Sequence, residues 1–172
     1  MRKFTTIAVL GAAAALLTAG PASASTHASA KATGNIVQVA SGAPQFSTLV
    51  SLIKKAGLVK TLSGKGPFTV MAPTNAAFAK VPKATLDQIA GDKTLLTKVL
   101  TYHVIAGKVP AAKVVTLNGK TATTVEGSTI AISVKGGKVY LNGSTQVTKT
   151  DIPASNGVIH QINGVLLPPD LD

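Results

Sequence analysis

The chain has 172 residues, no cysteine and a formal net charge of +11 at pH 7. A chain without cysteine has no disulfide, no thiolate metal site and no lipid-anchored cysteine. Its basic residues are almost all lysines spread along the chain, and few aromatic side chains are present to stack on bases, which argues against a nucleic-acid-binding protein.

The first 24 residues have the composition of a secretory signal peptide. Arg2 and Lys3 form a charged start, residues 7–19 are an apolar run without charge, and residues 22–24 are the small residues of a cleavage site. The apolar run is shorter than the roughly 20 residues that a membrane-spanning helix needs. We therefore predict a signal peptide over residues 1–24 and a secreted, extracellular protein.

The segment after the predicted signal peptide contains few large apolar side chains that could be buried. Residues 25–34 are rich in Ser, Ala, Thr and Lys, which predicts a flexible leader, and residues 28–30 offer a second cleavage site. At the other end, residues 168–172 contain no hydrophobic tail. We therefore expect no membrane anchor on the mature protein.

The mature chain keeps a strong positive charge. Removal of Arg2 and Lys3 leaves 15 basic residues against 6 acids, a net charge of +9. This balance favours anionic surfaces such as acidic polysaccharides, cell-wall polyanions and lipid headgroups, although the lysines could also serve only to solvate the surface. The remaining length is that of one domain, which can bury a core without metal or disulfide, and we expect a monomer.

The first half of the mature chain predicts helices. Residues 36–40 form a short apolar segment that fits either a helical turn or a strand. Residues 58–62 fit a loose turn. Pro44 suits a first helical position, and apolar residues then recur at helical spacing up to Gly57. A short strand over residues 68–71 precedes the remaining helix signals, which are Thr74 as N-cap of 75–80, Pro82 before a second helix and Asp92 as N-cap of a third.

After residue 103 the pattern changes to short strands. Asn118-Gly119 is a strong hairpin signal, so we predict that strands 114–117 and 120–125 pair across it. Further turns predict strands near 104–105, 129–134, 139–141, 145–148 and 156–168. Helices followed by short antiparallel strands indicate an α+β domain.

The last strand places a histidine between apolar neighbours. Alternation puts Val158, His160 and Ile162 on one face and Ile159 with Gln161 on the other. His160 is therefore either a core histidine or the edge of a site. Since no partner for catalysis accompanies it, we interpret it as a scaffold residue.

Residues that could carry catalysis are few. No nucleophile elbow, dinucleotide loop, phosphate loop or zinc-binding helix motif occurs. His27 falls in the leader, which leaves His103 and His160 as candidate bases, and a metal site on them would need Asp151. The six acids include no close pair. We therefore predict a protein that is not an enzyme and needs no cofactor or metal.

Three segments together resemble the signature segments of fasciclin (FAS1) domains. They are residues 69–78 (TVMAPTNAAF), 100–107 (LTYHVIAG) and 156–168 (NGVIHQINGVLLP), in the family's order and spacing. The resemblance implies a secreted bacterial single-domain member, with the domain over residues 35–170. It also implies a β-wedge or sandwich of about seven short strands with several helices packed at one side.

The resemblance further implies a function in cell adhesion, with an extracellular protein, a polysaccharide or a wall polyanion as partner. Some relatives hold apolar small molecules, so a carrier of an apolar ligand or lipid is the alternative. In animal members, receptor contact is attributed to segments that correspond to Tyr102-His103, with Leu100, Val104 and Ile105 around them, and to Asp151-Ile152. The residues themselves leave a second interpretation open, in which Tyr102-His103 pack in the core and residues 151–153 form a turn.

One departure from the family concerns the start of the helix after the first signature. Ala76 and Ala77 stand where the family often has an acidic residue, so this helix start lacks a carboxylate that its dipole would favour. We interpret Thr74, Asn75, His103 and His160 as structural signature residues. Our specific hypothesis is that Thr74 and Asn75 hydrogen-bond to His103.

Overall fold

The computed structural model describes residues 34–171. The predicted signal peptide and all of the predicted leader except Gly34 lie outside the described residues. The helical elements are α1 (Ile36–Ser41), the 3₁₀ turn η1 (Pro44–Phe46), α2 (Ser47–Ala56), α3 (Val59–Leu62), α4 (Asn75–Phe78), α5 (Lys83–Gly91), α6 (Lys93–Tyr102) and α7 (Ala111–Thr116). The strands are β1 (Phe68–Pro73), β2 (Val104–Ala106), β3 (Lys120–Thr123), β4 (Thr129–Lys135), β5 (Lys138–Leu141), β6 (Thr145–Ala154) and β7 (Gly157–Ile162).

The seven strands form one sheet in the order β2-β1-β7-β6-β5-β4-β3. All neighbours are antiparallel except β1 and β7, which run parallel with Met71 opposite His160. The two ends of this order approach each other, because Ile105 bridges to Thr124 and the Val125 N–H donates to the carbonyl of Val104 at 2.7 Å. The sheet is therefore folded back on itself. The predicted α+β class with seven strands and several helices is confirmed.

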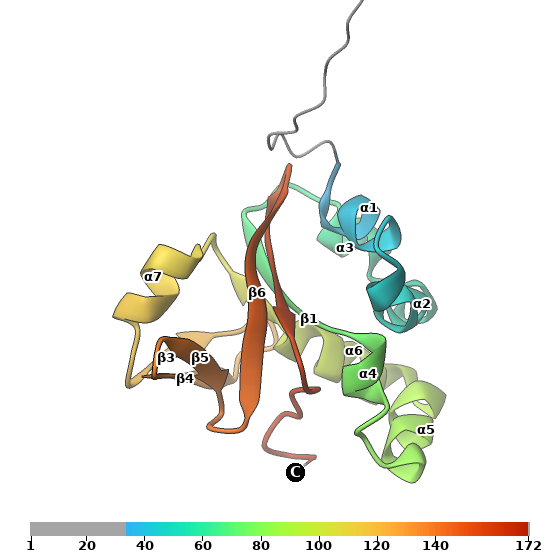
Figure 1. The fold of residues 1–172 in the computed structure, drawn as a ribbon. Helices are drawn as coiled ribbons and strands as arrows, with labels where there is room; N and C mark the ends of the chain where they lie inside the picture. Colours follow the sequence, from blue (N-terminus) through green and yellow to red (C-terminus); the bar gives the residue numbers. More distant parts are fainter. Residues whose placement is uncertain (1–33, 172) are drawn as a thin grey trace, which may run out of the picture. The chain divides into compact units, whose positions relative to one another are not determined.

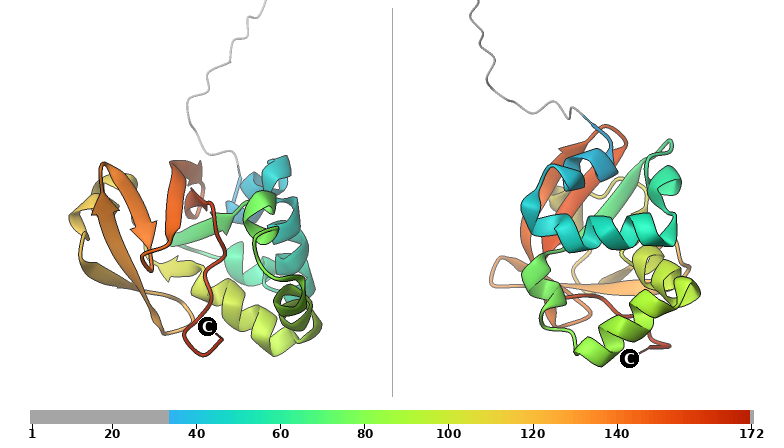
Figure 2. Two further views of the ribbon diagram at one scale, coloured as in Figure 1. Left: turned by 60° about the horizontal axis from the view of Figure 1, so that its bottom comes forward. Right: turned by 90° about the vertical axis from the view of Figure 1, so that its right-hand side faces the viewer.

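Helices α1 to α6 gather on one side of β1 and β7, and the hairpin strands β3 to β5 lie on the other side (Figures 1 and 2). The buried residues accordingly form two clusters. Ile159 belongs to the cluster that packs under the helices, whereas Met71 and Ile162 belong to the one enclosed by the sheet. The predicted alternation along 158–162 is confirmed. Because both faces of β1 and β7 are covered, these strands are buried along almost their whole length.

Side-chain caps define several helix starts. Asp92 Oδ1 accepts from the N–H groups of Thr94 and Leu95, and Thr74 Oγ1 accepts from the N–H of Ala77 at 3.2 Å. Both predicted caps are confirmed. Asn35 forms a capping box with Gln38, which makes residues 36–41 a helix and decides between the two predicted alternatives. The loose turn predicted at 58–62 contains the one-turn helix α3.

The predicted strand 114–117 is wrong. Residues 111–116 form helix α7, which begins after Pro110, contains the helix-forming Ala111 and Ala112, and buries Val114. Asn118-Gly119 therefore links a helix to β3 and is not a hairpin turn between two strands. Gly119 has φ +79° there, a conformation in which glycine carries no steric cost.

Strand β6 is longer than predicted. It runs to Ala154 through two irregularities in its pairing with β7, one between Val147 and Lys149 and one between Lys149 and Ile152. Residues 151–153 thus belong to a bulged strand and not to a turn. Asp151 has φ +56°, in the left-handed region where Asp is better tolerated than most residues.

The turn between β6 and β7 ties distant segments together through one side chain. The Asn156 amide donates to the carbonyls of Leu62 at 2.7 Å and Gly64 at 2.9 Å, and its Oδ1 accepts from the N–H of Ile36 at 3.0 Å. One side chain thereby satisfies backbone groups at the end of α3 and at the start of α1, where helices leave such groups unpaired. Asn156 begins the last signature segment, and no local pattern in the sequence indicates this role.

Replacement of Asn156 by Ala should therefore lower the free energy of unfolding by about 2 kcal/mol, because three partly buried backbone groups lose their partner. Chemical denaturation monitored by circular dichroism measures this change. Asn118→Ala is the control, since Asn118 makes a single exposed bond to the N–H of Val134. Equal effects for the two variants would contradict the anchoring role of Asn156.

Candidate functional site

Tyr102 and His103, two of the predicted recognition residues, lie at the end of α6 and are each only 2% exposed. The Tyr102 hydroxyl donates to the carbonyl of Thr129 at 3.1 Å and accepts from the Asn142 amide at 3.0 Å. Tyr102 thereby ties α6 to the hairpin strands. A partner cannot contact either side chain unless this part of the fold opens.

The His103 ring joins α6 to the C-terminal segment. Its Nδ1 lies 2.7 Å from the carbonyl of Val99, and its Nε2 accepts from the N–H of Leu166 at 2.9 Å. Because the carbonyl can only accept and the N–H can only donate, the ring is neutral with its proton on Nδ1. Burial lowers the His103 pKa to about 4, against the opposing effect of the Val99 hydrogen bond.

The predicted hydrogen bond from Thr74 or Asn75 to His103 is not formed. The Asn75 amide instead bonds to the carbonyl of Pro44, the hydroxyl of Ser47 and the N–H of Thr48. Asn75 thus ties α4 to the start of α2. The hypothesis fails because both nitrogens of the His103 ring already have backbone partners.

Both ring nitrogens of His160 also form hydrogen bonds with backbone groups. Its Nε2 lies 2.7 Å from the carbonyl of Val109, and its Nδ1 accepts from the N–H of Asp151 at 3.3 Å. The ring is therefore neutral with its proton on Nε2. Burial lowers the His160 pKa, while the Val109 bond and the Asp151 charge act in the opposite direction.

His160 is part of a clamp on residues 107–111, which run from the end of β2 to the first residue of α7. Thr69 Oγ1 donates to the carbonyl of Gly107 at 2.7 Å and accepts from the N–H of Val109 at 2.8 Å. Asp151 Oδ1 accepts from the N–H of Ala111 at 2.8 Å. Strands β1, β7 and β6 thus each contribute one side chain that holds this segment. No local pattern in the sequence indicates the role of Thr69.

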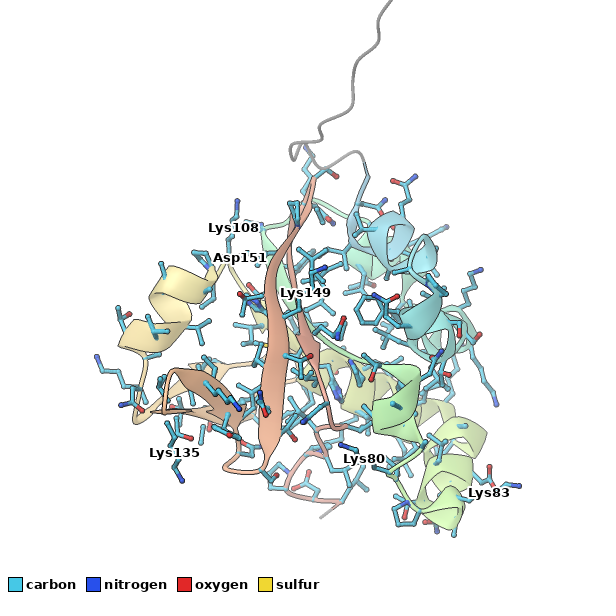
Figure 3. The ribbon with its side chains drawn as sticks, in the orientation of Figure 1. Lys80, Lys83, Lys108, Lys135, Lys149 and Asp151 are labelled. Carbon is cyan, nitrogen blue, oxygen red and sulfur yellow. The ribbon has the colours of Figure 1, made fainter. Side chains whose placement is uncertain are left out.

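Asp151 and Ile152 lie on the bulged part of β6. Asp151 is exposed, and within residues 34–171 only one of its two carboxylate oxygens has a hydrogen-bond partner. Ile152 is half-buried against the helix-side cluster. Figure 3 labels Asp151 with Lys108 and Lys149, two exposed lysines from the clamped segment and from β6. The bulge therefore presents a carboxylate in a position that the backbone holds.

A family model, described as fasciclin domain, matches residues 44–168. The chain belongs to the fasciclin domain family. A Synechocystis protein named sll1483 is 49% identical over 136 residues, which cover 78% of this chain and 73% of that protein. Immunogenic protein MPB70 of Mycobacterium bovis is 34% identical over 139 residues, which cover 78% of this chain and 69% of that protein.

Longer proteins match this chain over part of their length. The transforming growth factor-beta-induced protein ig-h3 of Sus scrofa is 35% identical over 136 residues, which are 79% of this chain and 20% of that protein. A solved FAS1 domain pair from the insect cell adhesion molecule Fasciclin I superposes with a TM-score of 0.66 at 18% identity, over 81% of this chain and 53% of that one. The predicted fasciclin-type fold is thus confirmed.

No group of three His, Cys, Asp or Glu side chains that could hold a metal occurs within the described range. The Asp151 carboxylate bonds to a backbone N–H and orients no histidine.

None of the helices among residues 34–171 is long and apolar enough to cross a membrane.

An apolar cavity lies among α2, α5 and α6. Its lining includes Leu52, Leu86, Leu96, His103 and Val165, and its volume is about 10 Å³. A cavity of this size is comparable to the space for one water molecule. In this conformation it has no room for a lipid or another apolar ligand.

Proposed function

We propose that this protein is a secreted, non-catalytic adhesion module that binds a component of the extracellular matrix through its exposed surface. The observation that carries the proposal is the contrast between its buried and its exposed polar groups. Both ring nitrogens of His103 and of His160 bond to backbone groups, whereas one carboxylate oxygen of the exposed Asp151 has no hydrogen-bond partner within residues 34–171. The fasciclin fold and its likeness to an insect cell adhesion molecule support the same function.

Asp151 and Ile152 are the proposed contact residues. The free Asp151 oxygen can complete the coordination shell of a divalent cation held by a partner, because such cations prefer oxygen ligands. Ile152 offers apolar surface beside it. The Ala111 N–H donates to the Asp151 carboxylate, and the Asp151 N–H donates to His160. These two bonds fix the carboxylate before the partner binds, which lowers the entropy cost of binding.

Asp151→Asn tests this contact. Asn keeps an acceptor for the Ala111 N–H and tolerates a positive φ, so the fold should stay unchanged while the charge is lost. We expect binding to isolated extracellular matrix to weaken at least about tenfold, and only in buffer that contains calcium or magnesium. Surface plasmon resonance with and without chelator measures the change.

Asp87→Asn is the matched control, since Asp87 is an exposed acid on α5 and the charge change is the same. Equal binding by both variants would remove Asp151 from the contact. Loss of binding accompanied by a changed circular dichroism spectrum would likewise count against it, because the carboxylate would then be needed for the fold.

A basic protein that adheres to wall polyanions is the second candidate, and the net charge of +9 that remains without the predicted signal peptide favours it. Such adhesion depends on exposed lysines and should fall steeply with ionic strength, because salt screens exposed charges. It should also be the same for Asp151→Asn and for the unchanged protein. The carrier of an apolar ligand has no comparable support, given the volume of the apolar cavity.

A further inference from the structure

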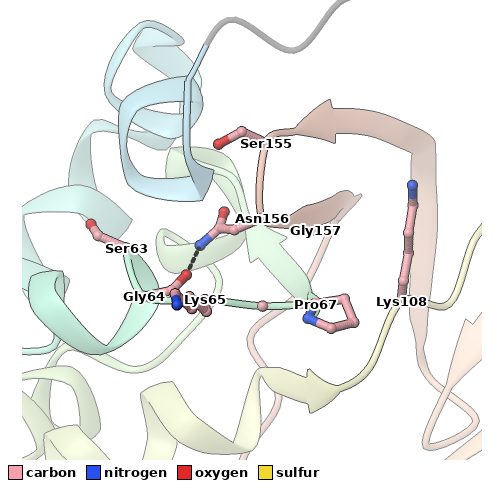
Figure 4. Close-up of a pocket in the computed structure, with 9 residues that line it drawn as sticks. Ser63, Gly64, Lys65, Pro67, Lys108, Ser155, Asn156 and Gly157 are labelled. Atoms are coloured by element: carbon pink, nitrogen blue, oxygen red, sulfur yellow. Dashed lines mark hydrogen bonds between the residues drawn. The ribbon is translucent and has the colours of Figure 1, made fainter.

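A surface pocket of about 580 Å³ lies where three separate segments meet. One wall is the loop of residues 63–67, the second is the turn of residues 155–157, and the third is Lys108. Figure 4 shows the loop on one side, Lys108 on the other and the Asn156-Gly157 backbone between them. The pocket shares Asn156 and Gly157 with the last signature segment, and neither Asp151 nor Ile152 lines it.

Hydrogen bonds fix the walls of the pocket. The Asn156 amide holds the carbonyl of Gly64, the Phe68 N–H donates to the carbonyl of Asn156, and the Gly107 N–H donates to the carbonyl of Pro67. A Cβ on Gly66 would overlap the carbonyl oxygen of Asn156, so the loop and the turn are as close as glycine allows. The pocket is therefore built before any ligand binds.

The polar groups around the pocket are mainly unused donors. Within residues 34–171, the hydroxyls of Ser63 and Ser155, the N–H groups of Lys65 and Gly66 and the ammonium groups of Lys65 and Lys108 have no protein acceptor. The carbonyls of Gly64, Pro67 and Asn156, in contrast, already accept hydrogen bonds. Among the described residues, no acidic side chain lines the pocket.

We infer that this pocket binds the oxyanion group of an anionic saccharide, a phosphate ester or a uronate carboxylate. Both groups accept several hydrogen bonds at once, and charge-assisted bonds from lysine are stronger than neutral ones. The volume falls within the roughly 300–1,000 Å³ of small-molecule pockets and exceeds the needs of one oxyanion, which leaves room for the sugar that carries it. The inference rests on the proposed function in so far as it takes the saccharide to belong to the extracellular matrix.

Titration of the ¹⁵N-labelled protein with inorganic phosphate, and separately with glucuronate, tests the pocket by NMR. We expect saturable shifts at the amides of Gly64, Lys65, Gly66 and Gly157, and the probe that binds more tightly identifies the source of the oxyanion. The double variant Lys65→Gln/Lys108→Gln should bind about tenfold more weakly. The control is Lys54→Gln/Lys55→Gln, which removes the same charge from the exposed side of α2.

Two results would overturn the inference: shifts that follow exposed lysines all over the surface, or equal weakening by the two double variants. Either would show attraction to overall charge without a site. The matrix-binding assay separates this inference from the proposed function. If Asp151→Asn abolishes adhesion but keeps the phosphate-induced shifts, the result supports both the proposed function and the pocket. If the unchanged protein fails to adhere in every assay while the phosphate-induced shifts persist, the result supports the pocket but not the proposed function.

Discussion

Gly157→Ala should destabilise the domain by roughly 4 kcal/mol, more than most single substitutions do. A Cβ at Gly157 would overlap the carbonyl oxygen of Phe68 and lie 2.8 Å from its carbonyl carbon and 2.9 Å from its nitrogen. Phe68 and Gly157 face each other at the start of the parallel β1–β7 pair, in the middle of the sheet. The blocking atoms are all backbone atoms of Phe68, so the added methyl group cannot be accommodated unless β1 and β7 move apart and break ladder bonds.

Chemical denaturation at constant pH measures this loss, with Gly91→Ala as the control. Gly91 ends α5, and a Cβ there meets no atom within 4 Å. Its replacement should leave stability unchanged or raise it slightly, because Ala loses less backbone entropy than Gly on folding. A Gly157→Ala variant as stable as Gly91→Ala would show that β1 and β7 separate more easily than their pairing indicates.

Local signals in the sequence predicted those features that depend on residues close together in the chain. Asp92 and Thr74 predicted helix starts because a short polar side chain satisfies N–H groups only two or three residues ahead. Gly136-Gly137 and Asn142-Gly143 separate the strands predicted near 129–134, 139–141 and 145–148, and all four residues adopt the positive φ that such turns need. Asn118-Gly119 carried the same signal, and there tertiary packing of Val114 selected a helix before it.

Contacts between distant segments had no such signal. The parallel pairing of β1 with β7, the amide bonds of Asn156 and the clamp by Thr69 all join residues that are far apart in the chain. The same limit applies to the candidate site. Resemblance to the family picked out Asp151, but only the structure shows that its carboxylate holds α7 and that His103 bonds to Leu166.

The stability of the domain should fall as the pH drops below about 6.5, and His103 should account for most of the change. Protonation would place a second proton on Nε2, against the Leu166 N–H and away from water. The His103 pKa is about 4 in the folded protein because of burial, against 6.5 in the unfolded chain. Between these values the unfolded state binds more protons, so stability is complete above pH 6.5 and is lost as the pH falls toward 4.

The loss should reach roughly 3 kcal/mol near pH 4, since each pKa unit corresponds to about 1.4 kcal/mol. His160 acts in the same direction because burial lowers its pKa too. His103→Gln places a non-titrating acceptor within reach of the Leu166 N–H, so it should flatten the dependence of unfolding free energy on pH and leave a smaller slope from His160. Denaturation curves at several pH values between 4 and 7.5 measure both slopes. If the variant kept the full slope of the unchanged protein, the acid sensitivity would have to come from groups other than the ring that joins α6 to the C-terminal segment.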